Sequence, residues 1–250
     1  MKGLLLTAAL LSCVACAPSQ NLSKPQPEKA SDINLELGID YFRKGNLSMA
    51  KDKIDRALEQ NPRNAKAQAT AGLLYDRLND GRKSESHFDK ALSLEPNNPE
   101  FQNNYAVILC KRGKQAKGEK LFQQAAANPL YKTPEVAYLN AGNCARSANN
   151  LEHAEENFRK ALAMKPRFSE ALLQMADLEY QQKNYLSARG FIERYLDGGK
   201  PGAQILWLAY RIEKGLSNAN GAGNYAQRLK VEFPNAAETR QLLEDERNAG

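Results

Sequence analysis

The chain has 250 residues, and its 35 lysines and arginines against 29 aspartates and glutamates give a formal net charge of +6. This basic excess is mild and spread along the chain, whereas a nucleic-acid-binding protein would cluster it beside a stacking platform. Neither of the two histidines, His87 and His153, has a metal-ligand spacing, and no phosphate-binding glycine loop or nucleophile motif is present. We therefore expect no metal, no cofactor, no small-molecule substrate and no enzyme activity.

Residues 1–15 have the pattern of a secretory signal peptide, with a basic start at Lys2 followed by an apolar run over 3–11. The run is too short for a permanent membrane span, which needs about 20 residues. The segment ending in Leu11-Ser12-Cys13 resembles a bacterial lipobox, and Cys16 is a second candidate at a more usual signal length. Cleavage before Cys13 is favoured, with Cys16 as the alternative; a further alternative is that both are ordinary residues of the apolar run.

In the bacterial lipoprotein class the acylated cysteine becomes the mature N-terminus, and several acyl chains anchor a protein stably. Neither cysteine is followed by aspartate, which in that class implies passage to the outer membrane. The expected location is therefore the periplasmic face of the outer membrane. Residues 16–30, which carry three prolines and no apolar periodicity, are expected to be a disordered tether of about 20 Å.

From residue 31 onward a pattern returns about every 34 residues. In the first five units a small residue occupies position 8 and a bulky apolar residue occupies position 24; in all six a small residue occupies position 20 and a proline lies near position 32. The pattern resembles the tetratricopeptide repeat, a helix–turn–helix unit of that length. It predicts an all-α superhelical solenoid of about six repeats with a C-terminal cap. The expected repeats are 31–64, 65–98, 99–134, 135–168, 169–202 and 203–236, followed by a cap and tail over 237–250.

The recurring residue types have physical reasons. Glycine within a helix costs roughly 0.5–1 kcal/mol relative to alanine, so its return at position 8 indicates close packing of two helices. Proline near position 32 ends the second helix because it lacks the amide hydrogen and fixes φ. The sixth repeat departs from the pattern, with Tyr210 at position 8. Terminal repeats are often atypical because they cap the stack.

Cys110 and Cys144 lie one period apart, on the first helices of the third and fourth repeats. These helices are expected to be neighbours, and the compartment after export is oxidising. A disulfide across this junction is our hypothesis; the alternative is two small buried residues that never pair.

The first helices of such a solenoid line its concave face, through repeat positions 2, 5, 6, 9, 12 and 13. In the early repeats these positions hold an apolar strip of Leu35, Ile39, Phe42 and Leu73. Asparagines follow at Asn104 and Asn140, and an amide both donates to and accepts from a peptide backbone. We interpret the strip and the asparagines as a partner-binding groove. The alternative for the strip is that it only covers the core of the first repeat.

More specific strings lie in the middle of the chain: Asn103-Asn104-Tyr105 with Leu109-Cys110, Pro129-Leu130-Tyr131-x-Thr133-Pro134, and Asn140-Ala141-Gly142-x-Cys144. Together they resemble the pilotin lipoproteins of type IV pilus systems, the PilF/PilW family. The resemblance implies an outer-membrane lipoprotein that binds secretin subunits and promotes their targeting and multimerisation. It also implies that Cys110 and Cys144 pair, and that the early repeats bind the partner. A monomer is expected.

Two other functions remain open at this stage. One is an adaptor that gathers cell-wall hydrolases or other envelope enzymes, and the other is a component of the machinery that inserts outer-membrane barrels. Loss of the adaptor would alter cell shape, and loss of the insertion component would give a broad porin defect.

Overall fold

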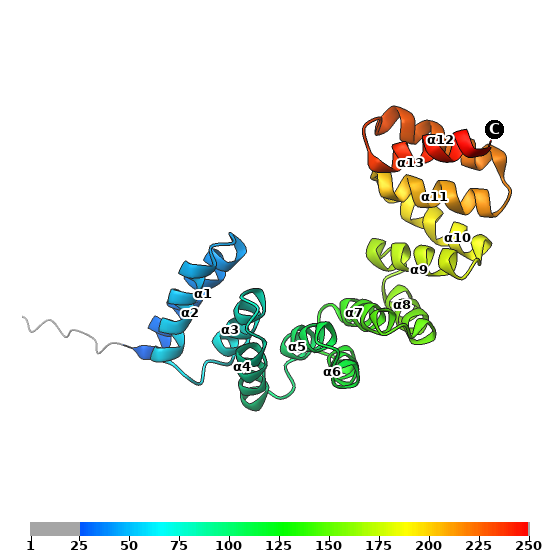
Figure 1. Ribbon diagram of the computed structural model, residues 1–250. Coiled ribbons are helices and arrows are strands. Elements are labelled where there is room, and N and C mark those ends of the chain that lie inside the picture. Colours follow the sequence, from blue (N-terminus) through cyan, green and yellow to red (C-terminus); the bar gives the residue numbers. More distant parts are fainter. Residues whose placement is uncertain (1–25, 250) are drawn as a thin grey trace, which may run out of the picture.

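The computed structural model describes residues 26–249, and in this range thirteen α-helices follow one another along a curved row (Figure 1). In chain order they are α1 (Pro27–Arg43), α2 (Leu47–Gln60), α3 (Ala65–Arg77), α4 (Gly81–Leu94), α5 (Pro99–Lys111), α6 (Gln115–Ala127), α7 (Pro134–Ser147), α8 (Leu151–Met164), α9 (Ser169–Gln181), α10 (Tyr185–Leu196), α11 (Ala203–Gly215), α12 (Ala219–Glu232) and α13 (Ala237–Ala249). The first twelve form six helix pairs, one for each repeat. The predicted all-α solenoid with a C-terminal capping helix is confirmed.

The N-terminal expectations fall mostly outside this range. The signal peptide, both candidate lipidation sites (Cys13 and Cys16) and residues 16–25 of the expected tether lie outside the described residues. Residues 27–30, which the predicted tether includes, are instead helical, because α1 begins at Pro27. Proline suits the first turn of a helix: its fixed φ is already helical, and the amide hydrogen that it lacks would have no partner there. Glu28 in the same turn adds a favourable charge at the helix N-terminus.

Each repeat turns between its two helices through one residue with positive φ. These residues are Gly45, Asn79, Gly113, Asn149, Lys183 and Ser217. In four repeats the second helix then starts at a side-chain cap; the Asn46 side chain, for example, accepts a hydrogen bond from the backbone amide of Met49 at 3.2 Å. The second helices end at Gln60, Leu94, Ala127, Met164, Leu196 and Glu232, each shortly before a proline. Local sequence therefore sets where each helix starts and stops.

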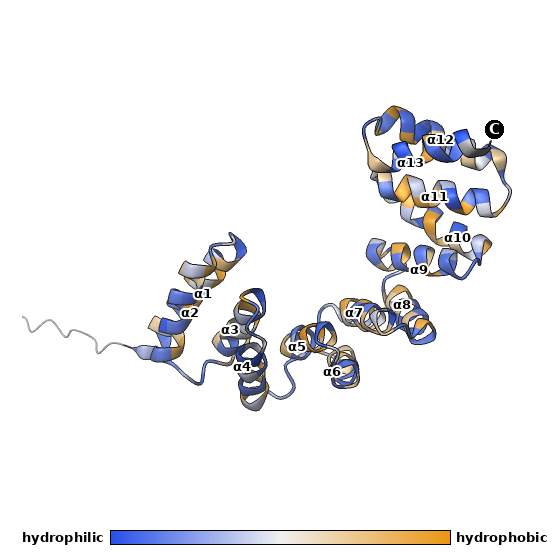
Figure 2. Cartoon of the chain, in the orientation of Figure 1, coloured by the Kyte–Doolittle hydropathy of each residue, from blue (hydrophilic) through white to orange (hydrophobic). Residues whose placement is uncertain are grey.

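The small residue at position 8 makes room for the bulky residue at position 24 of the same repeat. In repeat two, a Cβ atom added to Gly72 would lie 2.5 Å from the Phe88 ring. Phe88 is fully buried and stacks on Tyr105 of the next repeat, with ring centroids 5.2 Å apart. The core is thus a series of small clusters, each joining neighbouring repeats. Apolar and polar residues alternate along the helices, as expected when each helix buries one side (Figure 2).

At the C-terminal end, α13 covers the last helix pair. Leu242 of α13 is fully buried in a cluster with Leu206, Leu229 and Tyr210. The unusual Tyr210 therefore packs in the interface with α13 and stacks on Trp207, with ring centroids 5.2 Å apart. This explains why a large residue occupies position 8 only in the capped repeat.

Candidate functional site

The predicted apolar strip of the early repeats divides into a buried and a half-buried part. Leu35 is 2% exposed and packs with Ala57 and Ala67, so it belongs to the core, as the alternative interpretation held. Ile39 packs partly buried against the same cluster. Phe42 lies partly buried beside the cluster around Ile54, and Leu73 beside the cluster around Phe88. Direct contact with a partner is thus open to Ile39, Phe42 and Leu73 but not to Leu35.

The outer edge of α1 adds two apolar residues that sequence reasoning did not assign. Ile33 and Leu37 are 61% and 44% exposed, and their spacing of four places them on one side of the helix. One period later the same repeat positions hold Ala67 and Ala71, both fully buried against the preceding repeat. Among residues 26–249 no helix precedes α1, so this edge of α1 is open within the described part of the chain. The signal was present in the sequence, because these apolar residues occupy packing positions of the first repeat.

The asparagines of repeats three and four form a chain of amides between α5 and α7. The Asn140 side chain donates a hydrogen bond to Asn103 at 3.0 Å, and Asn103 donates to Asn104 at 3.5 Å. Asn103 is buried, whereas Asn104 and Asn140 are half-buried. The two predicted residues are therefore joined through a third, Asn103, which was not among the predicted groove residues. These hydrogen bonds hold the half-buried amides of Asn104 and Asn140 in fixed positions.

The disulfide between Cys110 and Cys144 is confirmed. It joins α5 to α7, and the two Cα atoms lie 5.6 Å apart, inside the usual range for a bridged pair. Both cysteines also line a hollow of about 520 Å³, together with Asn140, Asn143 and Ser147 among others. The covalent bond therefore fixes the floor of the concave face where repeats three and four meet.

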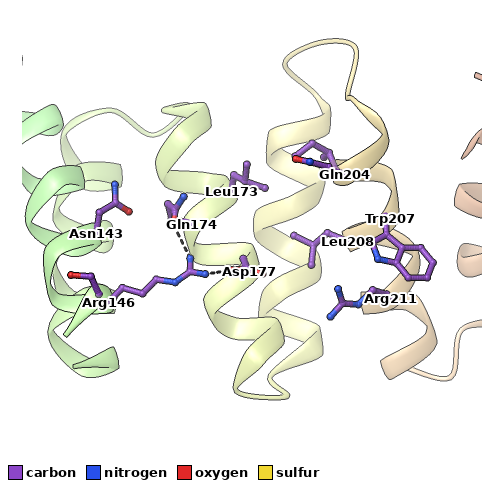
Figure 3. Close-up of a pocket in the computed structure, with 11 residues that line it drawn as sticks. Asn143, Arg146, Leu173, Gln174, Asp177, Gln204, Trp207, Leu208 and Arg211 are labelled. Atoms are coloured by element: carbon purple, nitrogen blue, oxygen red, sulfur yellow. Dashed lines mark hydrogen bonds and ion pairs between the residues drawn. The ribbon is translucent and has the colours of Figure 1, made fainter. Parts of the chain in front are cut away.

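A second hollow of about 600 Å³ lies further along the concave face, between α7, α9 and α11 (Figure 3). Arg146 reaches from α7 to α9, where its guanidinium donates to Gln174 at 2.7 Å and pairs with Asp177. From α11, Trp207 and Arg211 line the same space. Sequence analysis named no site residue here. The signal was available, because these residues occupy the concave positions of repeats four, five and six.

Across the described residues, no helix has the length and apolar character needed to cross a bilayer.

Comparisons with known proteins identify tetratricopeptide repeats in this chain and a relative that matches nearly its whole length. Tetratricopeptide repeat profiles match residues 65–98, 87–120 and 137–203. The type IV pilus assembly protein PilF of Pseudomonas aeruginosa is 26% identical over 239 residues, which cover 95% of each chain.

Two solved structures are similar as well. The crystal structure of PilW, described as a widely conserved type IV pilus biogenesis factor, superposes with a TM-score of 0.76 at 30% identity, over 85% of this chain and 98% of that one. The structure of Pseudomonas aeruginosa PilF superposes with a TM-score of 0.74 at 26% identity, over 88% and 99% of the two chains.

Proposed function

Because the chain belongs to the PilF/PilW family of tetratricopeptide-repeat proteins of type IV pilus assembly, we propose that it is a pilotin-type scaffold. In this role it binds secretin subunits and promotes their targeting to the outer membrane and their multimerisation there. The observation that carries the proposal is the match to PilW and PilF over nearly the full length of those chains. A similarity limited to the repeat units would not point to a particular function, because repeats of this kind occur in proteins of many functions.

The first repeat offers two apolar surfaces for such a role, one at the outer edge of α1 and one on its concave side. Ile33 and Leu37 are exposed at the open edge of α1, and Ile39, Phe42 and Leu73 are half-buried on the concave positions. An apolar segment of a newly exported subunit would bury area against them, which stabilises a complex by about 25 cal/mol per Å² before the costs of association. Capture also shields that segment from aggregation. The amides of Asn104 and Asn140 would hydrogen-bond the backbone of an extended segment that continues along the groove.

The expected acyl anchor completes the mechanism. A lipid on Cys13 or Cys16 confines the complex to the membrane surface, which raises the local concentration of captured subunits. Ring assembly is then favoured by proximity, and no bond is made or broken.

The test compares secretin in membrane fractions from cells with and without this protein, on gels that preserve heat-resistant multimers. We expect multimers to disappear and monomers to persist in its absence. Normal multimers at the outer membrane would overturn the proposal, and the chain would then be read as an envelope adaptor unless its loss gave a broad porin defect.

Point variants then test the surface. Phe42→Glu and Leu37→Glu place a charge on the proposed contact and should reduce multimers severalfold. Leu37 is 44% exposed, so its variant leaves the core unchanged. The matched control is Val231→Glu, which adds the same charge at a residue 73% exposed on α12. An equal effect of Val231→Glu and Leu37→Glu would contradict the assignment of the surface.

A further inference from the structure

We propose that the hollow between α7, α9 and α11 is a second peptide-binding site. It takes an extended segment whose acidic side chain binds Arg211 and whose neighbouring apolar side chain packs on Trp207. This site is separate from the first-repeat surface, and the inference does not rest on the proposed function.

The Arg211 side chain is held in place through its Nε, and its terminal nitrogens remain available to donate hydrogen bonds to a ligand. Its Nε donates a hydrogen bond to the Tyr180 hydroxyl at 3.1 Å, and its guanidinium lies 4.4 Å from the centroid of the Tyr180 ring. Among residues 26–249, no carboxylate lies within ion-pair distance of it. The terminal nitrogens of a guanidinium form a planar fork that binds a carboxylate through two hydrogen bonds. Stacking fixes the fork in advance, so little freedom is lost on binding.

The charge balance of the hollow favours an acidic ligand. Its charged lining residues are Arg146, Asp177 and Arg211. Arg146 and Asp177 pair with each other, which leaves the positive charge of Arg211 without compensation in the hollow. A carboxylate ligand would meet this charge without displacing an existing ion pair.

The apolar part of the hollow stands beside this charge. Trp207 and Leu173 are half-buried, and Leu208, which lies between them in the view of Figure 3, is 7% exposed. A half-buried tryptophan offers a large, rigid surface, and tryptophan and arginine are the residues most enriched in binding hot spots. An aliphatic or aromatic side chain next to the acidic residue fits this combination.

The hollow continues into its neighbour, which indicates a segment that passes through rather than a chain end. Asn143 and Ser147 line both this hollow and the one beside the disulfide. A peptide could thus run from Asn143 and Ser147 to Arg211, with its backbone hydrogen-bonded to the Asn143 amide. For this reason the carboxylate is assigned to a side chain and not to a C-terminus.

The test uses Trp207, the only tryptophan of the chain, as a built-in probe. The purified full chain is titrated with three pools of nonapeptides. The first pool is capped at both ends and carries aspartate or glutamate next to leucine or phenylalanine. The second replaces the acidic residue by its amide. The third is the amide pool with an uncapped C-terminal carboxylate.

We expect the capped acidic pool to change the Trp207 emission saturably, and to bind at least about tenfold more tightly than the other two pools, because hydrogen bonds to charged groups are the strong ones. Arg211→Gln should lose about tenfold in affinity for this pool, and Arg211→Lys should lose less, since it keeps the charge but not the fork. Circular dichroism checks that both variants stay helical. Arg63→Gln, the same change at an exposed arginine of the first repeat, should bind as the parent does.

Three results would overturn the proposal: no saturable change with the acidic pool, unchanged affinity in Arg211→Gln, or tighter binding of the pool with the uncapped C-terminus. Secretin multimers in cells carrying Arg211→Gln report separately on the proposed function. Their persistence beside a loss of peptide binding would show that the two sites act independently.

Discussion

The two ends of the solenoid are built from the same kind of helix pair but differ in how its outer apolar residues are covered. In the first repeat, Ile33 and Leu37 are exposed at positions that later repeats bury, whereas α13 covers the last repeat and its Leu242 is fully buried. A repeat builds only half of each interface, so an end stays apolar unless something covers it. This protein has an added helix at one end and an open edge at the other. The difference is why the proposed secretin contact includes the exposed side of α1.

The disulfide between these two regions gives the largest expected effect. Replacing both Cys110 and Cys144 by serine should lower the free energy of unfolding by about 3–4 kcal/mol, because the unfolded chain regains the freedom of a long loop. Urea denaturation followed by circular dichroism measures the whole chain, while Trp207 fluorescence reports on the capped end. We expect the two transitions to separate in the variant. Coincident transitions at an unchanged midpoint would contradict this role for the bridge.

The second largest effect on the free energy of unfolding is expected from the capping helix α13. Leu242→Ala should cost about 3 kcal/mol, since it leaves a cavity in a fully buried cluster. The matched change at the open end, Leu37→Ala, should cost less than about 0.5 kcal/mol because Leu37 is 44% exposed. Both are measured by urea denaturation of the purified protein. Equal costs would mean that the open edge is covered in the isolated molecule, and the contrast between the ends would be lost.

Acidification should act on the second repeat, near the open end. Burial, followed by the charge of Lys90, lowers the pKa of His87 below its ordinary value of 6.5. The unfolded state therefore takes up the proton first, so the stability contributed by neutral His87 is present above pH 6.5 and falls as the pH drops toward the folded pKa. Denaturation midpoints between pH 7.5 and pH 5 should depend less on pH in His87→Gln. An unchanged pH dependence in this variant would exclude His87 as the cause.

The smallest expected effect concerns the turns. Lys183 has a φ of 64°, a conformation that costs an L-residue roughly 1 kcal/mol, while Gly45 and Gly113 hold the same position in other repeats. Lys183→Gly should raise stability by about 0.5 kcal/mol once the extra freedom of glycine in the unfolded chain is counted. Thermal melting checks this, with Gly113→Ala as a control of opposite sign. A lower melting temperature for Lys183→Gly would show that the Lys183 side chain stabilises its turn.

The repeat pattern predicted the helix pairs well because small residues and prolines recur at positions fixed by packing, and it predicted the disulfide because the two cysteines lie on neighbouring first helices. It failed at Pro27, which was read as part of a tether although proline is well suited to a first helical turn. It also placed Leu35 on the surface, since a position in the repeat does not say how deeply a side chain is covered. The setting of Arg211 depends on Tyr180 in the preceding repeat, and no local pattern encodes such a contact.

The disulfide also has a mechanical consequence. A solenoid that is pulled at its ends first extends elastically, and its repeats then unfold one after another. The bond between Cys110 and Cys144 closes a loop, because the two residues are 34 positions apart in the sequence. About 120 Å of contour therefore stays locked however hard the ends are pulled. The pulling force is transmitted through the covalent bond from α5 to α7. The residues around the hollow beside the disulfide therefore bear less of the force that unfolds the other repeats.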